Sequence, residues 1–91
     1  MKINAIDKNG RISEYDAILT YHSEEYNKHY VVYTENAYNE FNELIIHISS
    51  YNLLNPETVV KNIEDKEEYN KIKTEVNKIL LTIKNEADKI D

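Results

Sequence analysis

The spacing of apolar residues changes near residue 64. Before that point apolar residues alternate with polar ones or form short runs, which is typical of β-strands because successive side chains point to opposite faces. After it they recur every three or four residues, as on one face of an α-helix. These helical positions are Tyr69, Ile72, Val76, Ile79, Leu80, Ile83, Ala87 and Ile90. The pattern predicts a small sheet followed by one long C-terminal helix.

The part of the chain before residue 64 contains several segments with strand character, at 2–7, 12–22, 29–34, 44–48 and 58–60. Lys8-Asn9-Gly10 favours a tight turn between the first two, because Asn-Gly adopts the backbone angles of such turns. Alternation in the second segment predicts one shared face for Tyr15, Ala17, Leu19 and Tyr21. The segment 29–34 is β-branched and aromatic throughout, which indicates a central strand.

The helix has a clear start signal, since Asp65 is followed three residues later by Glu68 in the pattern of a capping box. No helix breaker occurs between Lys66 and Asp88, so the helix would be roughly 35 Å long. The fold class we predict is α+β, an antiparallel β-meander of three to five strands with the long C-terminal α-helix packed on one face. Residues 1–91 form a single domain, β-rich over about 2–63 and helical over about 65–88.

Composition excludes several classes of protein. The net charge is −6, with 11 basic against 17 acidic residues, which disfavours direct binding to nucleic acid. The absence of cysteine excludes disulfides and thiolate metal sites. No apolar run approaches the roughly 20 residues that cross a membrane, and the N-terminal residues lack the apolar core of a signal peptide. We therefore expect a cytoplasmic protein.

Five motifs, taken in order, carry a family resemblance. They are Asp7-Lys8-Asn9-Gly10, Ala17-Ile18-Leu19-Thr20-Tyr21, Tyr30-Val31-Val32-Tyr33-Thr34, Ile46-His47-Ile48-Ser49-Ser50-Tyr51 and the acidic segment 63–69. Over about residues 7–80 the chain resembles the DUF1292 (YrzB-like) family of small acidic bacterial proteins of unknown function. The resemblance implies the same fold and a bacterial cytoplasmic setting, and it supplies no catalytic residue. The chain departs from the family at Tyr38 and Phe41, and in a helix that continues past Leu80.

The polar residues do not form a recognisable catalytic or metal-binding motif. A metal site would need two or three of His22, His29 and His47 to converge with a carboxylate, and His29 and His47 are the pair that adjacent strands could bring together. Ser49 and Ser50 lie near His47 in the sequence, but no glycine is beside them to build an oxyanion nest. We predict a protein without a catalytic site, a metal or a cofactor.

The aromatic residues divide into two groups. Tyr15, Tyr21, Tyr30 and Tyr33 are expected in the sheet, and Tyr69 is expected to anchor the first helical turn. Tyr38, Phe41 and Tyr51 fall in predicted loops. Acidic residues surround the first two, which suits binding to a basic protein surface such as a nucleic-acid-binding groove. The candidate protein-binding residues are Glu35, Tyr38, Glu40, Phe41, Glu43 and Tyr51. The alternative is that Phe41 folds back over the sheet edge.

The row of apolar positions along the predicted helix, which we call the seam, also has two interpretations. Packing on the chain's own sheet is the favoured one, and a homodimer through the distal helix, from Ile79 onward, is the alternative.

For function, the leading hypothesis is a non-enzymatic protein-interaction or regulatory protein. The alternative is a phage or mobile-element inhibitor of the anti-defence (anti-CRISPR-like) kind. Such an inhibitor would use its acidic surface to block the basic groove of a nucleic-acid-binding protein.

Overall fold

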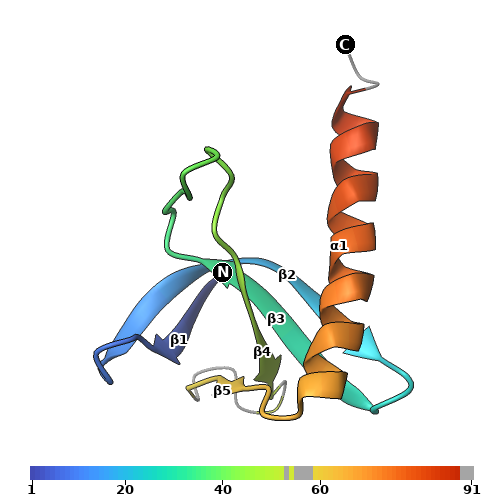
Figure 1. Cartoon of the computed structure of the whole chain (residues 1–91). Coiled ribbons are helices and arrows are strands. Elements are labelled where there is room, and N and C mark those ends of the chain that lie inside the picture. The colour runs from blue at the N-terminus through green and yellow to red at the C-terminus, as the bar shows by residue number, and fades with distance from the viewer. Residues whose placement is uncertain (53, 55–58, 89–91) are drawn as a thin grey trace.

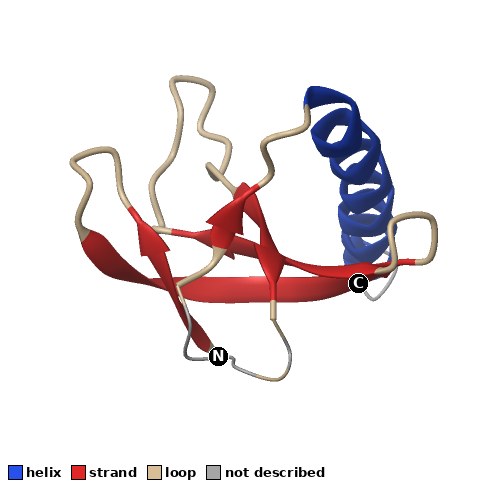
Figure 2. Ribbon diagram, turned by 90° about the horizontal axis from the view of Figure 1, so that it is seen from below, coloured by secondary structure: helices blue, strands red, loops and turns tan. Residues whose placement is uncertain are grey.

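The computed structural model describes residues 1–52, 54 and 59–88 and shows an α+β fold. Five strands form one antiparallel sheet in the order β1-β2-β3-β4-β5 (Figure 1). The strands are β1 (Lys2–Ile6), β2 (Ile12–Ser23), β3 (Lys28–Thr34), β4 (His47–Tyr51) and β5 (Lys61–Asn62), and the helix is α1 (Lys66–Asp88). The predicted meander with one C-terminal helix is confirmed. Figure 2 shows the helix beside one end of the curled sheet.

The long strand β2 contains a β-bulge that reverses its faces. Ala17 pairs with Tyr33 and Leu19 pairs with Val32, so Ile18 is an extra residue opposite the partner strand. Tyr15 and Ala17 therefore contribute to one core cluster, and Leu19 and Tyr21 contribute to another. The expectation that these four side chains share one face was wrong, because an inserted residue shifts the alternation by one position.

The strand β3 contributes to both clusters and is the middle strand of the sheet, which confirms the prediction of a central strand. Val31 and Tyr33 belong to the cluster on the sheet face away from the helix, and that cluster comprises Ile3, Ala5, Tyr15, Val31, Tyr33 and Val60. Tyr30 and Val32 belong to the cluster beneath α1, whose buried members are Tyr30, Val32, Ile48, Ile72 and Val76.

The helix begins as its sequence predicts. Asp65 Oδ1 accepts hydrogen bonds from the backbone N–H groups of Glu67 and Glu68, at 2.9 and 3.1 Å. These bonds satisfy two amides that a helix N-terminus leaves without partners. The side chain of Glu68 is engaged by the sheet, where its Oε2 accepts a 2.5 Å hydrogen bond from the Tyr30 hydroxyl. Glu68 therefore joins the first turn of the helix to the centre of the sheet.

The helix packs on the sheet only over its first four turns. Ile72 and Val76 are buried and Tyr69 and Leu80 are partly buried, whereas Leu81 and Ile83 are exposed. Figure 1 shows the upper part of α1 standing clear of the strands. Ile79 is half-buried, and the last two of the predicted helical positions, the side chain of Ala87 and all of Ile90, lie outside the described residues. Within the described residues, no helix combines the length and apolar character that a membrane span requires.

Two strand boundaries differ from those expected. The fourth strand was expected at 44–48, but β4 begins at His47 and continues through Tyr51, which was expected in a loop. The backbone of Ile45 makes other hydrogen bonds than those of a strand ladder. Its N–H donates to the Ala37 carbonyl, and its carbonyl accepts from the Thr34 hydroxyl. The last strand, expected at 58–60, is β5 at Lys61–Asn62 instead. Within the expected segment, Thr58 lies outside the described residues.

Candidate functional site

The segment between β3 and β4, residues 35–46, forms a structured projection that we call the β3–β4 loop. Its two arms pair as a short hairpin, in which Tyr38 bridges Leu44 and the Ile45 N–H bonds the Ala37 carbonyl at 2.9 Å. In Figure 1 the loop rises from the sheet on the same side as the distal part of α1. The backbone pairing holds it in a defined shape.

The tip of the β3–β4 loop is organised by the side chain of Asn39. Its Oδ1 accepts hydrogen bonds from the backbone N–H groups of Phe41 and Glu43, each at 2.9 Å. Asn42 lies in the left-handed region at a φ of 61°, and its N–H bonds the Asn39 carbonyl at 3.0 Å. Asparagine suits both roles, because its short amide bonds nearby backbone and tolerates positive φ. The tip is therefore ordered by its own residues.

The base of the loop is fastened to the sheet. The Thr34 hydroxyl donates to the Ile45 carbonyl at 2.8 Å and accepts from the Asn36 N–H at 3.0 Å. The side-chain amide of Asn36 donates to Asp16 Oδ2 on β2 at 2.8 Å. These bonds connect both arms of the loop to β2 and β3, so its orientation relative to the sheet is fixed.

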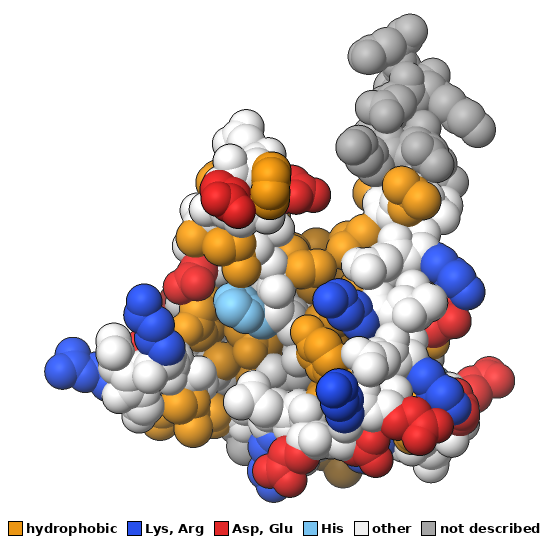
Figure 3. Space-filling view, in the orientation of Figure 1, with side chains coloured by type: hydrophobic (Ala, Val, Ile, Leu, Met, Phe, Trp, Pro, Cys, Tyr) orange, Lys and Arg blue, Asp and Glu red, His pale blue; other side chains and the backbone are white. Residues whose placement is uncertain are grey.

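The ordered loop presents large aromatic side chains to solvent. Tyr38 is 62% exposed and Phe41 is 74% exposed, and Leu44 is exposed beside them. The alternative in which Phe41 folds back over the sheet edge is therefore wrong. Glu40 and Glu43 are also exposed, and the segment 35–46 contains no Lys or Arg. Figure 3 shows acidic side chains on either side of a hydrophobic one at the top of this projection.

The structure brings together all the candidate binding residues except one. Glu35 lies at the base of the loop, with its Oε1 3.6 Å from His47 Nε2, and the other loop candidates follow it. Tyr51 lies at the opposite end of β4 from the loop, paired with His29. Its ring packs on the cluster away from the helix, and its hydroxyl approaches the Met1 sulfur at 3.8 Å. Tyr51 is thus remote from the loop tip.

A hollow between the loop and the distal helix was not foreseen from the sequence. Figure 3 shows this hollow, with hydrophobic side chains along its floor. Leu44 on the loop and Leu81 and Ile83 on α1 are exposed apolar residues of the two elements that flank it. No local pattern could have revealed it, because it depends on both elements projecting from the same side of the sheet.

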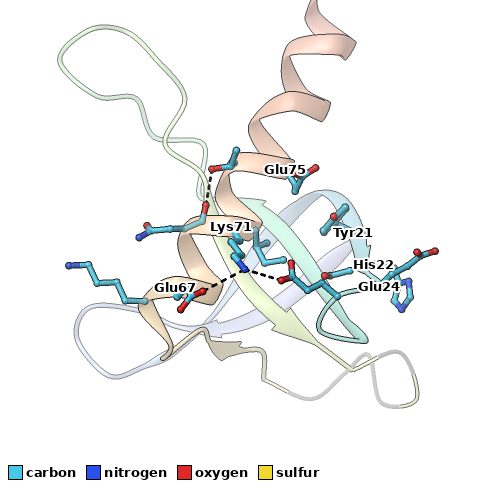
Figure 4. A pocket seen from close by; sticks show the side chains of 12 residues that line it. Tyr21, His22, Glu24, Glu67, Lys71 and Glu75 are labelled. Carbon is cyan, nitrogen blue, oxygen red and sulfur yellow. Dashed lines mark hydrogen bonds and ion pairs between the residues drawn. The ribbon is translucent and has the colours of Figure 1, made fainter.

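A second groove lies between the β2–β3 hairpin and the first half of α1, with a volume of about 1100 Å³ (Figure 4). Three of its charged groups, Lys71, Glu25 and Glu67, form ion pairs. Lys71 Nζ lies 2.9 Å from Glu25 Oε1 and 3.5 Å from Glu67 Oε1. The hydrogen bond to Glu25 raises the pKa of Lys71 above its ordinary value. An ammonium held by two carboxylates in its charged form is a surface ion pair rather than a catalytic base.

The other polar candidates occupy structural positions. Ser49 is buried, and its hydroxyl is hydrogen-bonded to the Tyr33 hydroxyl at 2.9 Å. His47 pairs with Tyr33 and His29 pairs with Tyr51, so His29 and His47 do not face each other as considered from the sequence. Among the described residues, no group of three or more His, Cys, Asp or Glu is placed to hold a metal ion.

Comparison with protein-family models, curated proteins and solved structures found no match to this chain. The resemblance to the YrzB-like family stays a prediction from the sequence.

Proposed function

We propose that this protein is a non-enzymatic protein-binding module, of interaction or regulatory type, whose contact element is the β3–β4 loop. The observation that carries the proposal is the exposure of Tyr38 and Phe41 on a loop ordered by Asn39. Aromatic side chains bury a large area while losing few rotamers, which makes them frequent anchors of interfaces. An ordered loop adds affinity because less conformational entropy is lost on binding.

The charges of the loop support a basic partner. Along the sequence Glu35, Glu40 and Glu43 flank the two aromatic residues. No Lys or Arg lies within 35–46, and the whole chain has a net charge of −6. An apolar centre with an acidic rim complements a surface where an apolar pocket is bordered by Lys or Arg. We propose such a surface as the partner, in keeping with the cytoplasmic bacterial setting that the YrzB-like resemblance implies.

A second candidate function specifies what this basic surface does. The acidic side chains at the loop tip resemble in charge the phosphates that a nucleic-acid-binding groove accepts. A protein with this loop would block such a groove, as an inhibitor encoded by a phage or mobile element does. The specific observation in its favour is the combination of acids and exposed aromatic rings at one tip.

The test compares affinity capture by three forms of the protein from cells of its own source. They are the wild type, the double variant Tyr38→Ser/Phe41→Ser, and the control Ile12→Ser, which removes a 65% exposed apolar residue at the start of β2. We expect the wild type and the control to recover the same protein, and the double variant to lose it. A partner retained by the double variant would exclude the loop as the contact element.

The purified partner then separates the two functions. For both, raising the salt concentration should weaken binding, because the rim contacts are between exposed charges. For the inhibitor, the partner's nucleic acid should compete with this protein for one site. Simultaneous binding of both would reject the inhibitor and leave the binding module intact.

A further inference from the structure

The register of β2 and β3 brings two histidines together. His22 lies directly opposite His29 at the end of this strand pair, and the centres of their rings are 4.5 Å apart with the planes inclined at 36°. We propose that this pair binds a late first-row divalent cation, Cu²⁺ first among them, through one nitrogen of each imidazole. The site is on a different element from the β3–β4 loop and does not depend on the function proposed for that loop.

The distance between the rings favours a particular coordination geometry. An imidazole nitrogen binds such an ion at about 2 Å, which places the ion about 3.2 Å from the ring centre. If each ring directs one nitrogen at a shared ion, ring centres 4.5 Å apart correspond to an angle of about 90° at that ion. A tetrahedral ion, with angles of about 109°, would hold the ring centres about 5 Å apart. Neighbouring positions of a square-planar or tetragonal ion fit better, and Cu²⁺ and Ni²⁺ prefer that geometry.

Both imidazoles are available to a ligand. Neither forms a hydrogen bond or ion pair with any described residue, and His22 is exposed while His29 is half-buried. Figure 4 shows the His22 ring at the rim of the groove, directed away from Lys71. His29 shares the sheet face of Val31, opposite the helix, because side chains alternate along β3. Water can therefore fill the remaining coordination positions.

The backbone that carries the two ligands is ordered by the strand pairing and by the turn between the strands. The connecting turn is closed by a 3.3 Å hydrogen bond from the Tyr26 N–H to the Ser23 hydroxyl, and Asn27 takes a φ of 51°. Ligands fixed by the scaffold bind an ion with less loss of entropy than two free side chains. Glu24, exposed in the same turn, adds negative charge beside the pair.

The third histidine supplies a matched control. His47 lies against the rings of Tyr33 and Tyr15, at 5.3 and 6.2 Å between centres, with the Glu35 carboxylate beside it. It has no second imidazole partner, since it pairs with Tyr33 across the strands. Replacing it removes one histidine and leaves the His22–His29 pair unchanged.

The test is a titration of the untagged protein with Cu²⁺, followed by electron paramagnetic resonance. We expect one ion per chain with two equatorial imidazole nitrogens. His22→Gln and His29→Gln should each weaken binding at least about tenfold and remove one nitrogen, because the second ligand acts at high effective concentration. His47→Gln should bind as the wild type does. Retention on an immobilised Ni²⁺ resin should follow the same order.

Three results would overturn the proposal. The first is tight binding that survives in the His22→Gln/His29→Gln double variant. The second is a loss of affinity in His47→Gln as large as that in His22→Gln or His29→Gln. The third is a wild-type spectrum without two imidazole nitrogens. Urea unfolding of each variant in the absence of metal shows whether it is folded, and we expect His22→Gln to match the wild type because that side chain is exposed.

Discussion

At the scale of single residues, Tyr30 is the residue that ties the sheet to the helix. Its side chain is fully buried, and its hydroxyl donates a 2.5 Å hydrogen bond to Glu68 Oε2. Glu68 is itself buried, and both its oxygens lie 3.4 Å from Lys28 Nζ. A buried carboxylate is costly unless it is hydrogen-bonded, so these two donors make its position tolerable. The cluster explains how an acidic residue fits between a helix and a sheet.

We predict that Tyr30→Phe lowers the free energy of unfolding by about 1–3 kcal/mol, because it leaves the Glu68 carboxylate with one partner fewer. Tyr21→Phe is the matched control. The Tyr21 ring stacks on Tyr30 at 6.4 Å, and its hydroxyl makes no hydrogen bond to a described residue. Tyr21→Phe should lower the free energy of unfolding by less than about 0.5 kcal/mol. Urea denaturation measures both, and equal stabilities for the two variants would contradict the prediction.

The hydrogen bond between Tyr30 and Glu68 also predicts that the folded protein loses stability at alkaline pH. Burial, and then the bond to Glu68, raise the pKa of Tyr30 above its ordinary value. The folded protein thus holds this proton more tightly than the unfolded chain, whose tyrosines titrate near about pH 10. The stabilisation from Tyr30 is complete below about pH 10 and is lost as the pH rises further.

Comparing the wild type with Tyr30→Phe isolates this effect. Burial also raises the pKa of Tyr15 and of Tyr26, so both proteins should lose stability in alkali. The stability difference between them should shrink as the pH rises above about 10. Urea denaturation at pH values on both sides of about 10 measures that difference. A difference that stays constant across this range would show that Tyr30 is not responsible.

At the scale of elements, the structure separates what the sequence can predict from what it cannot. The extents of β1, β3 and α1 follow from local periodicity, and the cap at Asp65 follows from local spacing. The faces of β2 and the start of β4 depend on pairing with other segments, through the bulge at Ile18 and the bonds of Ile45. The exposed loop aromatics were identified from their acidic surroundings. The ordering role of Asn39 depends on the local conformation of the loop, and the His22–His29 pair required the strand register.

The bulge predicts opposite outcomes for two single deletions in β2. Removing Ile18 leaves Ala17 opposite Tyr33 and Leu19 opposite Val32, so every side chain keeps its face. That variant should fold and unfold cooperatively, with some loss of stability. Removing Thr20 shifts the following residues by one position and moves Tyr21 to the wrong face. It should fail to fold, as judged by circular dichroism, and equal behaviour of the two deletions would argue against the bulge.

The helix cap gives a second prediction at this scale. Asp65→Ala removes the acceptor of two backbone hydrogen bonds and should cost about 0.5–2 kcal/mol of stability. Asp65→Asn keeps a side-chain oxygen in the same place, so it should lose only a fraction of that. Denaturant unfolding of the two variants measures the difference. If Asn were as harmful as Ala, the contribution of Asp65 would come from its charge near the helix dipole instead.

At the scale of the whole molecule, the parts that stabilise the fold are separate from those that project. The two core clusters hold the sheet and the first turns of α1 together, and Leu80 is the last helix residue that contributes to them. The β3–β4 loop and the helix beyond Leu80 extend from the same side of that body (Figure 1). Leu81 and Ile83 are exposed on the distal helix, where the alternative interpretation of the sequence expects a homodimer contact.

This separation predicts that the end of the helix can be removed without loss of the fold. Deleting residues 83–91 keeps every described member of both core clusters, so the free energy of unfolding should change by less than about 0.5 kcal/mol. Deleting residues 80–91 also removes Leu80 and should cost about 1 kcal/mol or more.

Sedimentation equilibrium of the shorter deletion adds the test of assembly, since a dimer of distal helices would become a monomer. A wild type that is monomeric at every concentration would reject the homodimer. A large loss of stability in the 83–91 deletion would show that the distal turns support the core.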